Sequence, residues 1–374
     1  MNKKADLEEK TERIVDMLSE NDLGGVLLNS QHNFSWLTGG ATNGIDLSRE
    51  AGDGTLLIRD DGKRFVLANR IEMSRLLKEE IAEEEFEPVE FGWEDERGSP
   101  TLIPDRARAL LKGKTALGSD LSLGQGVLTV EGAVTRCRYQ LTPSEIARFR
   151  SLGRDAGDAI GELMRTLEPG LAETEIGRKA THALASRGAH AVVVLVAADD
   201  RLRTFRHPVP KERRWEKVLM VVVCARREGL IVSLSRIICA GPVPTELKRR
   251  TEACARVDAR LLAATRPGVS GTHLYNLAAG AYASEGFEGE ERLHHQGGAC
   301  GYRTRDWLAF PSCEERVQAN QAFAWNPSIT GTKVEETSIT FEENSEVITA
   351  SPAWPSISVT FEGQEFSLPD VLSV

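Results

Sequence analysis

The sequence lacks the features that mark secreted and membrane-spanning chains. Its six cysteines form no CxxC pair, which in a chain of 374 residues indicates reduced thiols rather than a disulfide framework. The longest apolar stretches, such as 191–198, are less than half of the ~20 residues that a membrane span needs. The pair Lys3-Lys4 is followed by no apolar segment, so we expect no secretory signal and a cytoplasmic location.

Excess positive charge is also absent. The formal net charge is −10, from 56 acidic and 46 basic residues, so no sequence-wide attraction exists for nucleic acids or acidic membranes. Apolar residues make up 41% and charged residues 27%, a globular composition that excludes a disordered or fibrous chain. Because single cores rarely grow beyond about 250–300 residues, the length predicts two domains.

Residues 1–140 are predicted to form a small α/β domain. Apolar residues at helical spacing indicate an amphipathic helix over 7–20. Asp61-Gly62 supplies the tight turn of a hairpin, because glycine adopts positive φ without strain. Short strands are predicted at 26–28, 55–58, 64–67, 115–118 and 127–130.

The second domain, 141–374, is predicted to begin with a long helix. Thr142 is a good N-cap, Pro143 suits the first helical position, and Glu145 can close a capping box. Apolar residues then recur at helical spacing as far as Leu167, and Pro169-Gly170 ends the helix.

An internal repeat is the most informative feature of this domain. Residues 169–188 align without gaps to 267–286, including Pro-Gly at the start, glycine at the end and the threonines Thr174 and Thr272, which we expect to cap a helix in each copy. Strand-like sequence follows both copies. A unit present twice predicts a pseudo-twofold α+β domain, with helices covering a largely antiparallel sheet and a site between the halves.

Five motifs in order then suggest a family. They are HPVP at 207–210, GLIVSLSR at 229–236, HHQGGACGYRTRD at 294–306, WNPSITG at 325–331 and KVEET at 333–337. With the repeat and NFSWLTGG at 33–40, the chain resembles the creatinase/prolidase/aminopeptidase P family. The resemblance implies a pita-bread C-terminal domain, a smaller N-terminal domain, and a homodimer in which one subunit's N-terminal domain borders the other's site.

The family's metallopeptidases hold two metal ions with two Asp, one His and two Glu. The resemblance places Val222 and Ser233 at the aspartates, Gly298 at the metal histidine, Asn326 at one glutamate and Glu335 at the other, with Arg305 at the catalytic histidine. Valine and glycine offer no lone pair, and one carboxylate cannot offset two divalent charges. We therefore expect no metal site, no cofactor and no dimetal peptidase activity.

The remaining candidates suit acid/base chemistry without metal. His207 matches the family histidine that contacts substrate, and in creatinase-like members, which work without metal, the equivalent histidine is the acid/base catalyst. We expect Glu335 to hold a cationic or polar group of the substrate with help from Asn326. The third catalytic candidate is His294, which aligns with a histidine that lines the family pocket.

Arginines are expected to bind a substrate carboxylate through their forked donors. Arg305 is the main candidate, and Arg303 shares its face if the segment is a strand. His295 and Tyr302 complete the predicted binding set, although strand geometry would turn only one of His294 and His295 toward a ligand. The roles of Ser233 and of Cys300 as an alternative nucleophile stay open, and Arg236 is interpreted as a structural ion pair.

These residues predict a metal-independent hydrolase of a C–N bond in a small, carboxylate-bearing, non-peptide substrate. A lyase would use the same residues. A non-catalytic binder of a metabolite or partner protein would also explain the lost ligands, and a peptidase with one weak metal ranks last. An enzyme should hold His207, Glu335 and Arg305 around one site, whereas a dead scaffold should let them separate.

Overall fold

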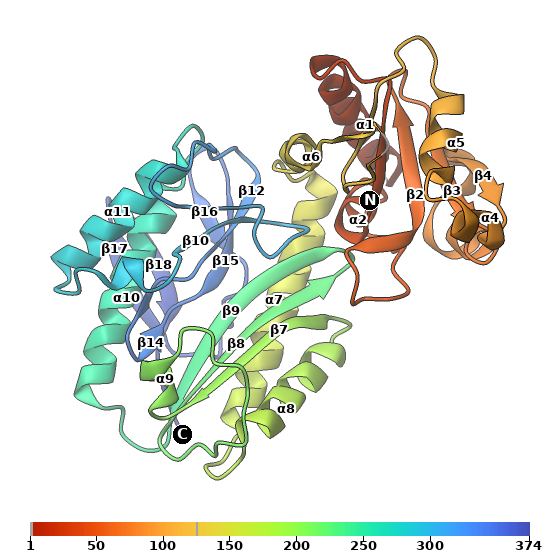
Figure 1. The fold of residues 1–374 in the computed structure, drawn as a ribbon. Coiled ribbons are helices and arrows are strands. Elements are labelled where there is room, and N and C mark those ends of the chain that lie inside the picture. The colour runs from red at the N-terminus through yellow and green to blue at the C-terminus, as the bar shows by residue number, and fades with distance from the viewer. Residues whose placement is uncertain (1–2, 125) are drawn as a thin grey trace. The chain divides into compact units, whose positions relative to one another are not determined.

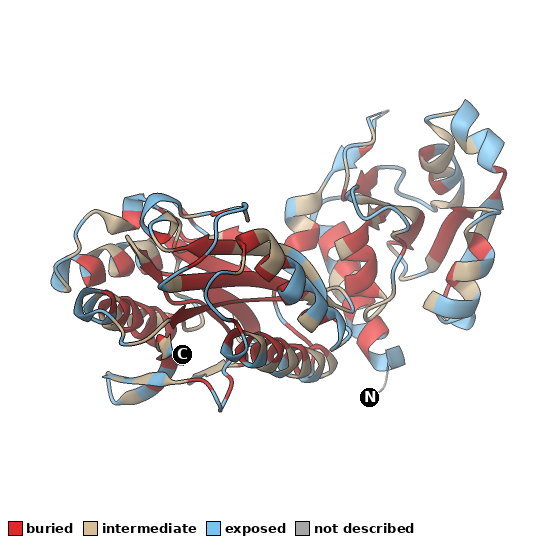
Figure 2. Ribbon diagram, turned by 90° about the horizontal axis from the view of Figure 1, so that it is seen from below, coloured by how far each residue is buried: buried red, intermediate tan, exposed pale blue. Residues whose placement is uncertain are grey.

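The computed structural model describes residues 3–124 and 126–374. The chain divides after Arg138 into two compact units, whereas the sequence placed the first domain at 1–140 (Figure 1). In each unit the strands of the sheet are mostly buried beneath helices and loops (Figure 2). Within the described ranges, no helix combines the length and the apolarity that crossing a membrane requires.

The N-terminal unit contains a six-stranded sheet of order β4-β3-β2-β1-β5-β6. Its strands are β1 (Gly25–Ser30), β2 (Ala51–Arg59), β3 (Arg64–Asn69), β4 (Glu87–Phe91), β5 (Leu117–Ser119) and β6 (Leu128–Thr129). Its helices are α1 (Lys3–Glu20), α2 (Gln31–Leu37), α3 (Met73–Arg75), η1 (Leu76–Glu80), η2 (Glu83–Glu85), α4 (Trp93–Gly98), α5 (Leu102–Leu110) and α6 (Glu131–Cys137). The predicted first helix and the β2–β3 hairpin are confirmed, with Gly62 at φ +78° in the turn.

The motif at 33–40 has a structural role in this unit. Ser30 caps α2 and donates its hydroxyl to Asp120 at 2.6 Å. The Asn33 amide donates to the same carboxylate and to Glu131, at 3.0 and 2.7 Å. These bonds tie α2 to β5 and α6 and satisfy polar groups that burial would otherwise leave unpaired.

The C-terminal unit contains two main sheets, of order β19-β9-β8-β7 and β11-β10-β12-β15-β16, and two hairpins. Its strands are β7 (His190–Ala198), β8 (Val218–Arg227), β9 (Leu230–Cys239), β10 (Gly297–Cys300), β11 (Trp307–Leu308), β12 (Gln321–Trp325), β13 (Ser328–Ile329), β14 (Thr332–Lys333), β15 (Glu336–Thr340), β16 (Ser345–Val347), β17 (Ser356–Phe361), β18 (Gln364–Pro369) and β19 (Leu372–Ser373). Its helices are α7 (Pro143–Arg165), α8 (Glu173–Ala185), α9 (Arg201–Thr204), α10 (Thr245–Ala264), α11 (Gly271–Ser284) and η3 (Glu290–Arg292). Helices α7 and α8 lie along the first sheet, and α10 and α11 pack together beside the second (Figure 1).

The internal repeat is visible in the backbone. Isolated bridges join Ala172 to Arg214 and Ser270 to Arg316. The Arg214 guanidinium donates to the Gly170 carbonyl at 2.6 Å, and Arg316 donates to the carbonyl of Gly268 at 2.7 Å. The same arginine clamp therefore closes the loop before α8 and before α11, as expected for a pseudo-twofold domain.

The predicted threonine caps of these helices are wrong. The N-caps are Ala172 and Ser270, two residues earlier than Thr174 and Thr272. Thr174 instead donates its hydroxyl to Glu212, and Thr272 to the Cys313 carbonyl. The bridges at the repeat loops start each helix earlier than the sequence pattern suggests. The capping box of α7 is confirmed, with Thr142 and Glu145 each bonding the other's backbone N–H.

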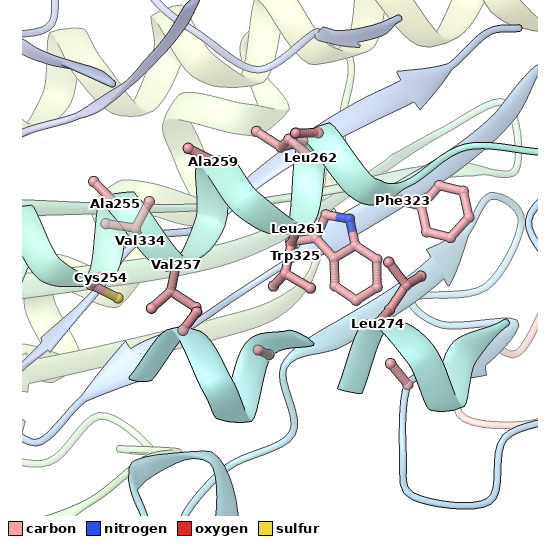
Figure 3. Packing of buried hydrophobic residues seen from close by; sticks show 14 of the residues in the cluster. Cys254, Ala255, Val257, Ala259, Leu261, Leu262, Leu274, Phe323, Trp325 and Val334 are labelled. Atoms are coloured by element: carbon pink, nitrogen blue, oxygen red, sulfur yellow. The ribbon is translucent and has the colours of Figure 1, made fainter. Parts of the chain in front are cut away.

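In the second half of the C-terminal unit, the hydrophobic core is built around α10 and β12 (Figure 3). Trp325 stacks on Phe323 with ring centroids 5.6 Å apart, and both are fully buried. The Trp325 indole donates to the Thr265 hydroxyl at 3.0 Å, so its polar atom is satisfied within the core. This packing holds β12, whose end leads directly into the predicted site residue Asn326.

Helix α7 lies unusually close to the chain that follows β16. A Cβ at Gly157 would sit 2.3 Å from the Thr349 carbonyl oxygen. Gly157→Ala should therefore lower the free energy of unfolding by about 1–3 kcal/mol, because a backbone clash forces the helix outward. Gly161→Ala is the matched control, since the atom nearest to its Cβ would be the Ser351 hydroxyl oxygen at an ordinary contact distance of 3.5 Å. Urea unfolding compares them; equal stabilities would contradict the close packing.

Asp258 of α10 predicts a pH-dependent stability. The side chain is 1% exposed, and neither carboxyl oxygen has a hydrogen-bond partner in the described parts of the chain. Burial, with Glu336 and Glu335 nearby, holds the pKa of Asp258 well above its usual range. The folded state thus keeps a proton that the unfolded chain releases near its ordinary pKa of about 3.9.

Stability should accordingly fall as pH rises above that unfolded value and through the raised folded pKa. Asp258→Asn removes this titration, so the variant should gain stability relative to the parent between pH 5 and pH 8. Chemical unfolding at both pH values tests it, with exposed Asp16→Asn as the control. A difference between variant and parent that does not change with pH would contradict the raised pKa.

Candidate functional site

Backbone hydrogen bonds join the two main sheets of the C-terminal unit at the candidate site. Val222 on β8 pairs with Ser235 on β9, and the Ser235 N–H donates to the Glu335 carbonyl at 3.1 Å. Across the second sheet, Trp325 pairs with Glu336, and the Asn326 N–H donates to the Gln296 carbonyl. These contacts place Asn326, which the resemblance aligns with a metal ligand, next to the segment that carries the two adjacent histidines.

Glu335 is a buried carboxylate held between two cations. It is 2% exposed, with Arg305 Nη2 3.3 Å from Oε1 and Lys333 Nζ 3.4 Å from Oε2. Arg305 also donates from Nη1 to the Ser233 hydroxyl at 3.2 Å, and Ser233 lies 3.2 Å from the Cys224 sulfur. Arg305 therefore links Glu335 to Ser233, the residue that the resemblance aligns with a metal aspartate. Sequence reasoning missed Lys333, although it lies two residues before Glu335 in the same motif.

Three histidines gather beside this charged cluster. His207 Nε2 lies 3.0 Å from His294 Nε2, and His294 Nδ1 lies 2.5 Å from the His295 carbonyl oxygen. The His294 and His295 ring centroids are 4.3 Å apart. The prediction that these neighbours face opposite ways is wrong, because they precede β10 in a bent segment rather than lying in a strand.

All three imidazoles favour the neutral form. Burial lowers the pKa of His294 to about 2, helped by the positive charge of Lys333 and by the other two histidines. Burial, Arg305 and Lys333 lower the pKa of His295 to about 4. The more exposed His207 has its pKa lowered by partial burial and Lys333, against the opposing effect of Glu335. At neutral pH the cluster therefore offers lone pairs rather than charge.

Several buried polar atoms of the site have no hydrogen-bond partner among the described residues. They are His295 Nδ1, Arg305 Nε and Asn326 Oδ1, and Glu335 Oε2 has no polar contact in the described ranges beyond the ion pair with Lys333 at 3.4 Å. Asn326 is 3% exposed and Glu335 2%, so bulk water does not readily reach them. Unpaired buried polar atoms are costly, and their concentration in one place indicates a surface that is completed by a polar ligand.

Two predicted binding residues lie elsewhere. Tyr302 is buried, and its hydroxyl donates to Glu145 at 2.7 Å and accepts from Arg148 at 3.1 Å, which gives it a structural role against α7. Arg303 is exposed, whereas the Arg305 side chain is largely buried. The two arginines do not share a face, because residues 301–304 form bends rather than a strand.

Cys300 and Arg236, the other candidates, are buried in the core. Burial raises the pKa of the Cys300 thiol to about 12, so it does not supply a thiolate nucleophile. Arg236 forms a buried pair with Glu336 at 2.8 Å and donates to the Thr349 carbonyl, which confirms its interpretation as a structural ion pair. Glu335 and Glu336 therefore lie on opposite sides of the chain and serve different purposes.

The residues present do not fit the family's two-metal centre. Val222 and Gly298 have no ligand atom, and a Cβ at Gly298 would lie 2.1 Å from the Trp307 carbonyl oxygen, so a larger side chain is excluded there. Arg305 and Lys333 already place two positive charges on the remaining carboxylate. A second pair of cations at that position would meet repulsion and too few ligands.

Comparisons with known proteins agree with this architecture. A model described as metallopeptidase family M24 matches residues 147–349, and one for the creatinase/prolidase N-terminal domain matches 10–151. No curated protein matches the chain significantly.

Solved structures share the fold at low identity. A Xaa-Pro dipeptidase from Bacillus anthracis is 19% identical, with a TM-score of 0.75 over 92% of this chain and 98% of that one. Dipeptidase PepE from Mycobacterium ulcerans is 16% identical, with a TM-score of 0.77 over 93% and 96%. The N-terminal domain of FACT complex subunit SPT16 from Cicer arietinum (chickpea) is 12% identical, with a TM-score of 0.69 over 92% and 97%.

The family resemblance and the α+β pita-bread fold predicted from the motifs are confirmed by these matches. The M24 model alone covers more than half of the chain. The chain therefore belongs to metallopeptidase family M24, a hydrolytic family, and carries a creatinase/prolidase N-terminal domain.

Proposed function

We propose that the protein is a metal-independent hydrolase that cleaves a C–N bond in a small, carboxylate-bearing, non-peptide substrate. The observation that carries the proposal is the group of unpartnered buried polar atoms around Glu335 and Arg305, beside the exposed His207. Such a surface favours a small ligand with both donors and acceptors. The hydrolytic character of the family supports bond cleavage rather than binding alone.

Charge balance selects the substrate class. Arg305 and Lys333 carry two positive charges against the single negative charge of Glu335. A ligand with one carboxylate neutralises the remaining charge, and the unpaired Arg305 Nε is a donor for it. Glu335 Oε2 and Asn326 Oδ1 are acceptors for the N–H groups of an amide, urea or guanidine.

The proton path begins at His207. The His294 Nδ1–H donates to the His295 carbonyl, so its Nε2 carries a lone pair that accepts from His207 Nε2–H. His207 Nδ1 is then the free base. It takes a proton from the attacking water, the new C–O bond forms, and the same proton passes to the departing nitrogen as the C–N bond breaks. His294 acts as a positioning residue that fixes the tautomer of His207.

The test is turnover of guanidino, carbamoyl and amide carboxylates, with creatine, N-carbamoylglycine and hippurate as first probes in EDTA-containing buffer. Release of amine, ammonia or urea is the readout. His207→Ala should reduce kcat by about 10²–10⁴-fold without lowering thermal stability, because general acid–base catalysis is lost at an exposed residue. Glu335→Gln should raise KM.

The control is His182→Ala, on the exposed face of α8. Activity that depends on added metal, or full activity of His207→Ala, would contradict the mechanism.

A second candidate is a non-catalytic binder. The observation in its favour is that Arg305 already bonds Glu335 and Ser233, so the site is stable without substrate. Calorimetric titration of the same compounds separates the two functions. Binding without product release, unchanged in His207→Ala, would favour the binder.

We further propose a homodimer, as the family resemblance implies. Ile45 and Leu47 of the N-terminal unit are 58% and 59% exposed and lie two positions apart, which makes them candidates for an apolar contact with a second subunit. Light scattering should give twice the chain mass, and the double change Ile45→Glu and Leu47→Glu should weaken association. A monomeric parent protein would overturn the proposal.

A further inference from the structure

We propose that His207, His294 and His295 bind one first-row transition metal ion of the zinc type, at a position distinct from the family's two-metal centre. The three residues each offer a ring nitrogen, and these ligand atoms all lie within 4.8 Å of one another. None of them comes from the five positions that hold metal in the family. The site stands independently of the proposed hydrolase activity.

The spacing of the nitrogens suits a single ion. Tetrahedral zinc with Zn–N bonds of about 2.0–2.1 Å separates its ligand nitrogens by about 3.3 Å. His207 Nε2 and His294 Nε2 are 3.0 Å apart, and the ligand nitrogen of His295 lies within 4.8 Å of those of the other two histidines. His207 is exposed and lies in the segment after α9. A rotation of its side chain can therefore shorten the distance from its ring nitrogen to that of His295 without disturbing the core. His294, by contrast, is 8% exposed and forms the fixed base of the site.

The surroundings of His294 resemble the support that metal-binding histidines need. Its Nδ1–H donates to the His295 carbonyl at 2.5 Å, which leaves the Nε2 lone pair directed at His207. A backbone carbonyl in this role fixes both the tautomer and the ring orientation of a metal ligand. His295 contributes a second signal, because its buried Nδ1 has no partner among the described residues.

The ligand type selects the kind of ion, because the positive charge nearby opposes every divalent cation and only strong bonds to imidazole offset it. Three imidazoles provide no negative charge, and Arg305 and Lys333 outnumber Glu335. Hard oxygen-seeking ions such as Mg²⁺ and Ca²⁺ are therefore disfavoured, whereas Zn²⁺, Ni²⁺ and Cu²⁺ bind imidazole well. The exposed side of His207 leaves a fourth position for an anion such as hydroxide, which would offset the local positive charge.

Metal binding and proton transfer by His207 exclude each other. Coordination through Nε2 moves the ring proton to Nδ1, so the base that the proposed mechanism uses disappears. Zn²⁺ should therefore inhibit the hydrolase, and this consequence alone rests on the proposed function.

The experiment is calorimetric titration of the EDTA-treated, dialysed full chain with Zn²⁺, with Co²⁺ absorption as a second readout. We expect one ion per chain and the visible bands of tetrahedral cobalt. His207→Ala and His294→Ala should each weaken binding by at least tenfold, whereas His182→Ala should bind as the parent does. Mg²⁺ at the same concentration should give no heat of binding.

The exposed position of His207 keeps the test valid even if His294→Ala fails to fold. Absence of Zn²⁺ binding, or binding unchanged in His207→Ala, would overturn the site. Two ions per chain that are lost in Glu335→Gln and retained in His207→Ala would place metal at the family position instead and also overturn it. Zn²⁺ binding that is weakened by the histidine variants, together with no hydrolysis of any probe, would support the metal site and contradict the proposed hydrolase activity.

Discussion

The site depends on how Glu335 is neutralised. A buried carboxylate is costly unless opposite charge and hydrogen bonds compensate it, and here Arg305 and Lys333 provide the charge from 3.3 and 3.4 Å. Removing one member would leave the others uncompensated in a buried place. The arginine also reaches Ser233 on β9, so the same interaction ties the two sheets of the unit together. Within this site, two protein cations compensate the charge of the buried carboxylate.

The chain keeps the family's fold, although the resemblance aligns other side chains with most of the metal-ligand positions. The solved relatives share the fold at 19% identity or less, which constrains strand order and packing rather than the groups in the site. Val222 belongs to a hydrophobic core cluster and Gly298 lies in the buried strand β10, so both positions contribute to packing. Trp325 and Phe323 remain packed beside Asn326, so β12 is positioned without any metal ligand after it.

Much of the fold follows from local sequence rules. The α7 capping box, the hairpin at Gly62 and the repeat at 169 and 267 each depend on a few neighbouring residues, and each is present. The site is harder, because it depends on where bends occur. His294 and His295 converge only because they lie outside the strand, and Arg303 separates from Arg305 for the same reason.

The hydrogen-bond partners of several side chains were equally impossible to predict from the sequence. Tyr302 donates a hydrogen bond to Glu145, which lies more than one hundred positions away in the sequence. The two helices expected to have threonine caps instead begin beside bridges between distant segments. Local patterns carry no information on such contacts.

The arginine clamp that repeats before α8 and α11 shows where the two halves diverge. His207 lies seven residues before Arg214, and the equivalent position before Arg316 is the buried Ala309. One copy of the loop therefore presents an imidazole to solvent, and the other fills the core. A perfectly symmetric domain would carry two identical groups and have no means of giving them different tasks. The two halves therefore share one backbone framework, and this loop position is a place where their side chains differ.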